Sequence, residues 1–416
     1  MTSSPNSGKR RYEIRINGHL DDRWTTWFDG MTVTRNDDGT TTFDGVIVDQ
    51  AALHGLLQRV RDAALPLVSV SPLVAEESAP LPATMKAAVS RHFGGPEVVE
   101  IQDVARPVPA SDEILIRVRA TTVSAADHRA RSRDVPAGLL IPSSLVLGIF
   151  RPRRPVLGMD AAGVVVQVGD RVERFAVGDE VVAMLGSRFG AHAEYAILKS
   201  TDAVAAKPRS MSFDDAASLV FGGITARAFL SQIAIAEGTT VLVNGASGAV
   251  GSAVVQLAKI AGAEVTGVSS AANGALVTSL GADRTIDYAT HDFAADGDRD
   301  GARYDVIVDC VGNAPVSRVL TSLTPGGAVL LVAGDLRSIV SAKRLARRHG
   351  ITVITAPGEH RSEDLEYVVD LADRGAFRPT IDRRYPFEQI RTAHRFVDSG
   401  RKRGSVVVTI PSALSH

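Results

Sequence analysis

The sequence has one cysteine, Cys310, and few aromatic residues, which make up 5% of its 416 residues. A single cysteine excludes an internal disulfide framework and any zinc site built on several thiolates. No apolar run approaches the roughly 20 residues that a membrane-spanning helix needs, and residues 1–11 lack the apolar core of a signal peptide. A formal net charge of −1 gives no bulk reason to bind nucleic acid or an anionic membrane. These absences predict a cytoplasmic protein with neither a nucleic-acid nor a membrane partner.

Residues 1–73 have the pattern of a small α+β module. Tyr12, Ile14 and Ile16 alternate with polar residues, as in a strand. A helix over 21–28, a hairpin over 31–48, a helix over 49–60 and a strand over 67–70 give the order β-α-β-β-α-β. This order is typical of a ferredoxin-like fold. The module contains no glycine loop, metal cluster or nucleophile constellation, so its role stays open.

A linker over 74–84, rich in Pro, Ala and acid, precedes a start-like segment at Met85. Residues 85–207 are rich in strand patterns, including 114–120 and 162–168. Residues 208–356 alternate helical and strand patterns, which predicts a parallel sheet. Residues 357–416 close with a strand run at 405–410. The expected strands of the parallel sheet are continuous apolar runs, at 240–244, 264–269, 305–311, 328–333 and 351–355.

A glycine loop joins the first of these strands to a helix. It reads Gly245-Ala246-Ser247-Gly248-Ala249-Val250-Gly251. Glycines let the backbone approach a pyrophosphate closely, and the next helix offers unpaired N–H donors. The strand–turn–helix setting, continued by further β-α units, predicts a dinucleotide-binding Rossmann domain rather than a plain packing turn.

The acid that usually holds an NAD ribose is missing from its expected place. The second strand ends in Ser269-Ser270-Ala271-Ala272-Asn273, without Asp or Glu. No carboxylate there would repel a 2′-phosphate, and two hydroxyls could bond it. This favours NADPH over NADH, although the same turn has no Arg or Lys.

Besides the glycine loop, further motifs lie at 85–89, 121–132, 155–169, 175–180, 189–195, 221–226, 280–288 and 304–312. With these motifs in order, the sequence from Met85 to Ile410 resembles the zinc-independent quinone oxidoreductase branch of the medium-chain dehydrogenases/reductases. The resemblance implies an α/β fold in which a Rossmann domain (208–356) is inserted into a GroES-like, β-rich catalytic domain (85–207 and 357–416). It also makes a homodimer plausible. The N-terminal module lies outside it.

Positions that hold zinc ligands in the zinc-dependent relatives are occupied differently here. Ser124 and Gly158-Met159-Asp160 replace a cysteine and a Gly-His-Glu motif. A hydroxyl and a thioether are poor substitutes for a thiolate and an imidazole. We therefore expect no metal, which disfavours simple alcohol oxidation and favours reduction of a polarised C=C bond.

The resemblance and the sheet pattern together give the remaining cofactor-binding candidates. Resemblance places Thr225 near the nicotinamide, and Tyr288 and Asn273 near the adenosine phosphate. Strand ends in an open α/β sheet also face the cofactor. This second argument adds Val311, Gly312, Ala333 and Gly334. The alternatives are a backbone-bonded helix threonine, ordinary turn residues and simple strand ends.

Two residues are candidates for the chemistry itself. Asp127 comes after a turn that resembles the family's active-site floor, and either bonds a carbonyl or a water or caps a local helix. Tyr195 either donates a proton or packs in a sheet. We expect structural roles for His128, His192 and Cys310. The basic run Lys343, Arg344, Arg347 and Arg348 is interpreted as a solvated helix face.

These patterns predict an NADPH-dependent reductase that delivers hydride to an enone, enal or quinone. Its partner would thus be a small-molecule carbonyl or quinone acceptor. Two alternatives stay open. One is an NAD(P)-dependent alcohol or aldehyde dehydrogenase. The other is a nucleotide-binding regulatory or scaffold protein, whose front module recruits a partner.

Overall fold

The computed structural model describes residues 10–20, 31–36, 39–47, 50–63, 65–73, 81–135, 138, 140–294 and 303–411. The chain divides into two compact units, Met1–Pro82 and Ala83–His416. Among the described residues, no helix is both long enough and apolar enough to cross a membrane.

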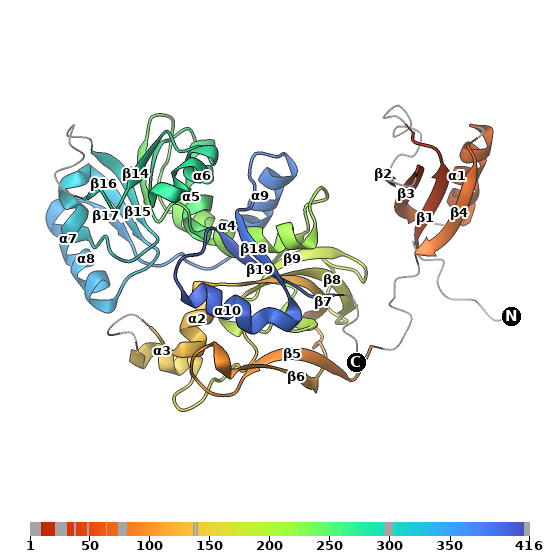
Figure 1. The fold of residues 1–416 in the computed structure, drawn as a ribbon, viewed down its shortest axis with the longest axis horizontal. Coiled ribbons are helices and arrows are strands. Elements are labelled where there is room, and N and C mark those ends of the chain that lie inside the picture. Colours follow the sequence, from red (N-terminus) through yellow and green to blue (C-terminus); the bar gives the residue numbers. More distant parts are fainter. Residues whose placement is uncertain are drawn as a thin grey trace. The chain divides into compact units, whose positions relative to one another are not determined.

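The first unit is a four-stranded antiparallel sheet with one described helix (Figure 1). The sheet order β2-β3-β1-β4 is that of the predicted ferredoxin-like arrangement. Leu53 and Val60 of α1 pack on Ile14, Ile16 and Phe43 of the sheet. The predicted helix over 21–28 and the capping residue Asp49 lie outside the described residues. The elements are β1 (Arg10–Asn17), β2 (Met31–Arg35), β3 (Thr40–Ile47), α1 (Gln50–Asp62) and β4 (Leu67–Leu73).

The second unit contains a β-rich part built from two separated stretches of chain. Its main sheet has the order β11-β9-β8-β7-β19-β18, with β10 also paired to β7. Strands β18 and β19 enter this sheet only after the parallel sheet is complete. The strands are β5 (Thr84–Ser90), β6 (Val99–Ala105), β7 (Glu113–Val123), β8 (Asp160–Val168), β9 (Glu180–Met184), β10 (Tyr195–Lys199), β11 (Ala203–Ala206), β18 (Ile381–Pro386) and β19 (Ser405–Thr409).

Between these stretches lies a six-stranded, all-parallel sheet in the order β14-β13-β12-β15-β16-β17. The predicted strands over 240–244 and 264–269 are confirmed as β12 and β13. The predicted strand over 305–311 ends early, because Asp309 begins a turn. The strands are β12 (Thr240–Asn244), β13 (Glu264–Ser269), β14 (Arg284–Asp287), β15 (Tyr304–Asp309), β16 (Leu323–Leu331) and β17 (Thr352–Ile354).

Helix α4 connects the two sheets. Its residues Leu219 and Ala226 belong to the core of the parallel sheet, whereas Val220 and Ile224 pack on the β-rich sheet. One buried helix therefore holds the glycine-loop side of the parallel sheet against the β-rich part. The helices of the second unit are α2 (Ala125–Ser132), α3 (Leu140–Leu147), α4 (Phe213–Leu230), α5 (Ala249–Ile260), α6 (Gly274–Ser279), α7 (Val316–Val319), α8 (Leu336–His349), α9 (Ser362–Asp373) and α10 (Ile390–Asp398).

Candidate active site

Four separated segments meet at the carboxyl edge of the parallel sheet. The glycine loop comes after β12, and Ser269 ends β13. Val311 and Gly312 come after β15, and Ala333 and Gly334 after β16. The chain order reverses at β12, which has β13 on one side and β15 on the other. In open α/β sheets, ligands bind outside the carboxyl ends of the strands at such a switch point.

The glycine loop is packed so closely that larger residues do not fit. Gly245 has a φ of +81°, and a Cβ there would lie 2.8 Å from Cγ2 of Val311. A Cβ on Gly251 would collide with the carbonyl oxygen of Gly245, and one on Gly222 of α4 with the carbonyl oxygen of Ala249. The loop is therefore a tight backbone cradle between α4 and the β15 turn.

Helix α5 begins in this cradle with its N–H groups uncapped by any side chain. Its N-cap is Gly248, which makes no side-chain cap hydrogen bond, and its first turn has no acidic residue. Helices α4 and α8, in contrast, are capped by Ser212 and Asp335. Free N–H donors and the positive end of the helix dipole suit a phosphate group.

A basic segment from the end of the chain adjoins the glycine loop. Arg401, Lys402 and Arg403 precede Gly404, whose N–H donates to the carbonyl oxygen of Ser247 at 2.8 Å. Gly404 also forms a parallel β-bridge with Gly248. The backbone of this segment therefore lies against the cradle. Sequence reasoning missed these cations, although their consecutive positions before the last strand were a usable signal.

Lys402 is the half-buried member of this segment. Its Nζ donates to the carbonyl oxygen of Gly404 at 2.7 Å. Burial lowers the pKa of Lys402 to about 8, against the opposing attraction of Asp382 and Asp160. Its charge is thus sensitive to pH in a range where an ordinary lysine stays charged.

A buried carboxylate, Asp309, shapes the turn after β15. Its oxygens accept the N–H groups of Val311, Gly312 and Ala314 at 3.0, 3.0 and 2.9 Å, and the Asn244 side chain at 2.8 Å. Nearby, burial raises the pKa of the Cys310 thiol, and the Asp309 charge adds to this effect. Asp309 therefore fixes Val311 and Gly312, whereas Cys310 stays protonated.

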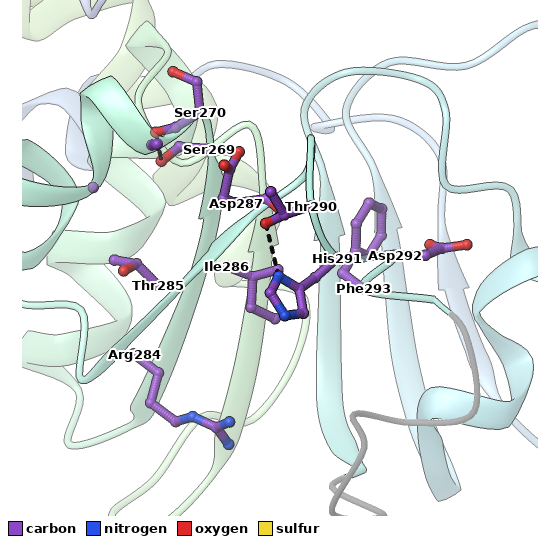
Figure 2. A pocket seen from close by; sticks show the side chains of 12 residues that line it. Ser269, Ser270, Arg284, Thr285, Ile286, Asp287, Thr290, His291, Asp292 and Phe293 are labelled. Carbon is purple, nitrogen blue, oxygen red and sulfur yellow. Dashed lines mark hydrogen bonds between the residues drawn. The ribbon is translucent and has the colours of Figure 1, made fainter.

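The expected adenosine end of the site is a cavity of about 560 Å³ beside β13 and β14 (Figure 2). Ser269 and Ser270 line it, and the buried Ser269 hydroxyl donates to the carbonyl oxygen of Ser270 at 3.1 Å. Asn273 donates from Nδ2 to Oγ of Ser247 at 3.1 Å, which ties it to the glycine loop. The structure thus brings these three residues together around the loop.

The same cavity contains a carboxylate that sequence reasoning missed. Asp287 is the register partner of Ser269 on the neighbouring strand, and both line the cavity (Figure 2). One Asp287 oxygen accepts the N–H of Ala289 at 3.1 Å. The turn after β13 has no acid, but β14 supplies one beside it.

Two of the remaining cofactor candidates have different settings. Thr225 lies on α4 with 8% of its surface exposed, and its hydroxyl makes no hydrogen bond to another described residue. The alternative, in which the Thr225 hydroxyl bonds the backbone of its own helix, is therefore not what the structure has. Tyr288 is 61% exposed and lines a second hollow with Asn313 and Arg318, outside the cavity of Ser269.

Asp127 has the contacts of a helix cap. It is fully buried and forms a capping box with Ser124 at the start of α2. Its Oδ2 accepts the N–H and the hydroxyl of Ser124 at 2.8 and 2.6 Å, and its Oδ1 accepts the N–H of Gly158 at 2.9 Å. Both oxygens are thus used within the protein, as in the capping alternative.

Tyr195 and the two histidines also lie within the β-rich part. Tyr195 on β10 is buried, and the guanidinium of Arg117 lies 5.7 Å from its ring centroid. His192 is buried and its Nε2 bonds the carbonyl oxygen of Thr122 at 3.0 Å. His128 contacts the carboxylates of Asp398 and Asp134. None of these contacts reaches the glycine loop.

The hydroxyl of Ser124 and the carboxylate of Asp160, at the positions expected to replace zinc ligands, are hydrogen-bonded within the protein. The Ser124 hydroxyl is bonded to Asp127, and buried Asp160 accepts the N–H and the hydroxyl of Thr122 at 2.8 and 2.6 Å. Burial raises the pKa of Asp160 to about 7, against the Thr122 hydrogen bonds. No group of three or more His, Cys, Asp or Glu side chains among the described residues has the arrangement of a metal site.

Sequence profiles of three families match separate parts of the chain. The alcohol dehydrogenase GroES-like domain matches residues 110–209, and the zinc-binding dehydrogenase family matches 280–408. Residues 11–71 of the first unit match a domain of unknown function.

Curated relatives and a solved structure match 76–79% of the chain. The chain is 31% identical to a quinone oxidoreductase homolog from Spinacia oleracea, over 77% of this chain and 96% of that protein. It is 30% identical to the Homo sapiens quinone oxidoreductase, over 76% and 94%. An NADPH-dependent alkenal/one oxidoreductase from Arabidopsis thaliana is also 30% identical, over 79% and 81%.

Among solved structures, the quinone oxidoreductase from Coxiella burnetii superposes with a TM-score of 0.69 at 26% identity, covering 79% of this chain and all of that one. On the strength of the identities above, the chain belongs to the quinone oxidoreductase-like medium-chain dehydrogenases/reductases.

Proposed function

We propose that this protein is a zinc-independent, NADPH-dependent oxidoreductase that transfers hydride to the β-carbon of an enone, enal or quinone. The observation that carries the proposal is the glycine cradle with the uncapped start of α5 beside the cations of residues 401–403. The relatives named for quinones and alkenals favour this acceptor class.

The residues present fit a nicotinamide dinucleotide. The backbone of residues 245–251 and the N-terminus of α5 would hold the pyrophosphate, with Lys402 as a neighbouring cation. Ser269, Ser270 and Asn273 would hold the adenosine ribose and its phosphate. On the other side of the switch point, Thr225, Val311, Gly312, Ala333 and Gly334 would border the nicotinamide, and Tyr288 the adenosine.

The cofactor supplies the hydride when it is bound. The protein orients the acceptor against it and excludes water from the crevice. Hydride addition to the β-carbon shifts electrons onto the carbonyl oxygen, and a proton must then reach the α-carbon. Asp127 has no free oxygen to take part, since three donors already bond its carboxylate. We therefore assign Asp127 a positioning role and the proton to water.

The preference for NADPH rests on Ser269, Ser270 and Asn273, and is opposed by Asp287. The hydroxyls and amide suit a 2′-phosphate, whereas the Asp287 carboxylate repels it and suits a free ribose hydroxyl. The cations of residues 401–403 add attraction for a cofactor with more phosphate charge. We propose that the attraction of these groups for the 2′-phosphate outweighs its repulsion by Asp287.

The donor set at the expected zinc positions disfavours a metal. The Ser124 hydroxyl, the Met159 thioether and the hydrogen-bonded Asp160 carboxylate lack the thiolate and imidazole that zinc prefers. We therefore propose that turnover needs no metal.

Domain boundaries and assembly belong to the same proposal. We place the domains at residues 1–73, 85–207 with 357–416, and 208–356, with a linker over 74–84. The entry of β18 and β19 into the β-rich sheet supports the split domain. Strand β17 at the edge of the parallel sheet offers backbone groups for pairing with a second copy. A cytoplasmic location stays a prediction.

The deciding experiment monitors NADPH absorbance with chelator-treated full-length protein and a panel of 1,4-quinones, enals and enones. NADH and simple alcohols with the oxidised cofactors are run in parallel. Chelator-insensitive NADPH consumption with one acceptor class supports the proposal. Alcohol oxidation abolished by the chelator would make the protein a dehydrogenase. Cofactor binding without turnover across the panel would favour a regulatory or scaffold protein.

A further inference from the structure

Exposed apolar side chains are concentrated in one region of the second unit. Of the fourteen large hydrophobic residues that are exposed among the described residues of this unit, seven lie in α3, the loop after it and the start of α8. Phe150 is 93% exposed and Leu145 is 65% exposed. Burying such residues away from water is favourable, so a cluster of this kind marks an interaction surface. The seven are Leu140, Leu145, Val146, Ile149, Phe150, Leu336 and Val340.

The two segments are neighbours in space. A Cβ on Gly138 would lie 2.8 Å from Cβ of Leu336, the first residue of α8. Figure 1 shows α3 and α8 on the same side of the second unit. We call the surface formed by Leu140, residues 143–154 and the exposed side of α8 the apolar–basic patch.

Ile149 and Phe150, here called the apolar tip, are held in place by contacts of the neighbouring residues. Leu147 packs against Ala130, Leu157 and Phe189. Arg133 donates to the carbonyl oxygen of Ile149 at 2.6 Å and to the hydroxyl of Ser144 at 2.9 Å. These anchors leave Ile149 and Phe150 pointing away from the core as an exposed tip.

The patch has positive charge only. Residues 138–159 contain Arg151, Arg153 and Arg154 and no acid, and residues 336–350 contain five Arg or Lys and no acid. All eight cations are exposed. On α8, Leu336, Val340, Arg344 and Arg348 are spaced at intervals of four residues, so one helix stripe runs from apolar to basic. The whole chain has a net charge of −1, so this segregation is local.

Contrary to the sequence prediction of no membrane partner, we propose that the apolar–basic patch docks the protein on the surface of an anionic lipid bilayer. Aliphatic and aromatic side chains beside arginines are the composition of interfacial membrane-binding segments. The apolar tip enters the headgroup boundary, and the cations attract the lipid phosphates. A nucleic acid would use the cations and leave Phe150 and Leu145 exposed. A symmetric contact between two copies would place eight cations against eight.

Docking would place the active site next to the bilayer. Leu336 lies two residues after Gly334, and Gly334 lies at the strand end expected to border the nicotinamide. An acceptor dissolved in the bilayer, such as a lipophilic quinone, would then have a short path to the site. This consequence rests on the proposed function, whereas docking itself does not.

The test is sedimentation of the full-length protein with vesicles. One set is phosphatidylcholine and the other is phosphatidylcholine mixed with phosphatidylglycerol. Binding is expected only with the anionic set, and it is expected to weaken as salt is raised. The double variant I149S/F150S is expected to lose at least about tenfold in affinity. The triple variant R344Q/R347Q/R348Q is expected to lose about a hundredfold, at about fivefold per cation.

Matched controls change similar residues elsewhere. V108S removes a side chain that is 71% exposed outside the patch, and R59Q/R171Q/R209Q removes three exposed cations elsewhere. Both controls are expected to bind anionic vesicles like the parent protein. Thermal unfolding and NADPH turnover with a water-soluble quinone report whether each variant folds. If turnover is absent in all proteins alike, the unfolding and vesicle results still decide docking.

Three outcomes would overturn the proposal. The first is no sedimentation with either vesicle set. The second is binding that the patch variants and the controls weaken equally. The third is a dimer in light scattering that I149S/F150S dissociates without vesicles, which would make the apolar tip a contact between copies. Retained vesicle binding together with absent turnover would instead defeat only the proposed function.

Discussion

The start of α5 and two buried carboxylates of the β-rich part differ in whether their hydrogen-bonding groups are already used. At the carboxyl edge of the parallel sheet, Gly248 leaves the first N–H groups of α5 without a side-chain cap. In the β-rich part, Asp127 and Asp160 are buried and their oxygens accept hydrogen bonds from Ser124, Gly158 and Thr122. A binding site needs hydrogen-bonding capacity that the fold has not used. This difference distinguishes the proposed cofactor-binding edge from the two carboxylates, which form a structural floor.

The largest expected effect comes from adding a side chain to the glycine cradle. In G251A the added Cβ would collide with the carbonyl oxygen of Gly245, so the start of α5 must move. We expect NADPH affinity to fall at least about a hundredfold, on the order of 3 kcal/mol. Nicotinamide fluorescence measures this affinity. The control G55A adds a Cβ in α1 with nothing within 4 Å, and unchanged binding in G251A would refute the cradle.

Removing the half-buried cation should have the next largest effect. K402A is expected to weaken NADPH binding by about ten- to a hundredfold, because a charge-assisted hydrogen bond contributes about 1.5–3 kcal/mol. K402R keeps the charge and should restore most of the affinity.

The pH dependence distinguishes a charge role for Lys402 from a packing role. Since the pKa of Lys402 is lowered to about 8, its charge is present below that pH and is lost above it. Parent affinity should therefore fall as the pH rises through about 8, whereas K402R should show no such fall. Equal pH profiles for the two proteins would remove Lys402 from the cofactor site.

Substitution of Asp287, the carboxylate that faces Ser269, tests the preference for NADPH over NADH. D287N removes a negative charge beside the expected 2′-phosphate, and we expect kcat/KM for NADPH over NADH to rise about tenfold, or about 1.4 kcal/mol. D287E keeps the charge and is the control. If D287N leaves the ratio unchanged, the phosphate does not lie near Asp287.

Because Asp160 is buried in the β-rich part, the stability of the protein should fall as the pH rises. The pKa of Asp160 is about 7 in the folded protein, against an ordinary value of 3.8. The folded state therefore binds this proton more tightly, and folding is penalised increasingly as the pH rises from about 4 to 7. D160N removes the penalty. We expect the free energy of unfolding of D160N to exceed that of the parent by about 2–4 kcal/mol at pH 8, and the two proteins to be nearly equally stable near pH 4.

Calorimetry or circular dichroism at the two pH values measures this difference in the second unit. T122V is a useful companion, because it removes the hydroxyl donor to Asp160 and should raise the pKa of the acid further. A D160N protein that is less stable than the parent at pH 8 would show that the ionised acid supports the floor.

Local patterns predicted the parallel sheet and its glycine loop well. Strands β12 and β13 are continuous buried runs, and a G-x-x-G-x-x-G turn marks the passage from the first of them into α5. The strands of the first unit were likewise visible in alternation and turn residues. Such features depend on neighbouring residues, which a single sequence displays.

The residues that sequence reasoning missed depend on pairing between distant segments. Asp287 faces Ser269 only because β13 and β14 pair in that register. Lys402 reaches the glycine loop because Gly404 bridges Gly248, far away in the sequence. The apolar pattern extends a strand through Asp309, since nothing local shows that its carboxylate gathers four donors. Tertiary contacts of this kind leave no periodic signal.

The smallest expected effect concerns Tyr195, the last candidate for the chemistry. Y195F keeps the ring that packs beneath Arg117 and removes only the hydroxyl. If water supplies the proton, kcat should stay within about twofold of the parent, with an unchanged solvent isotope effect. A general acid in this position would contribute about a hundredfold or more. A fall of that size in kcat, with KM for NADPH preserved, would move Tyr195 from a structural role into the reaction and weaken the contrast between the two regions.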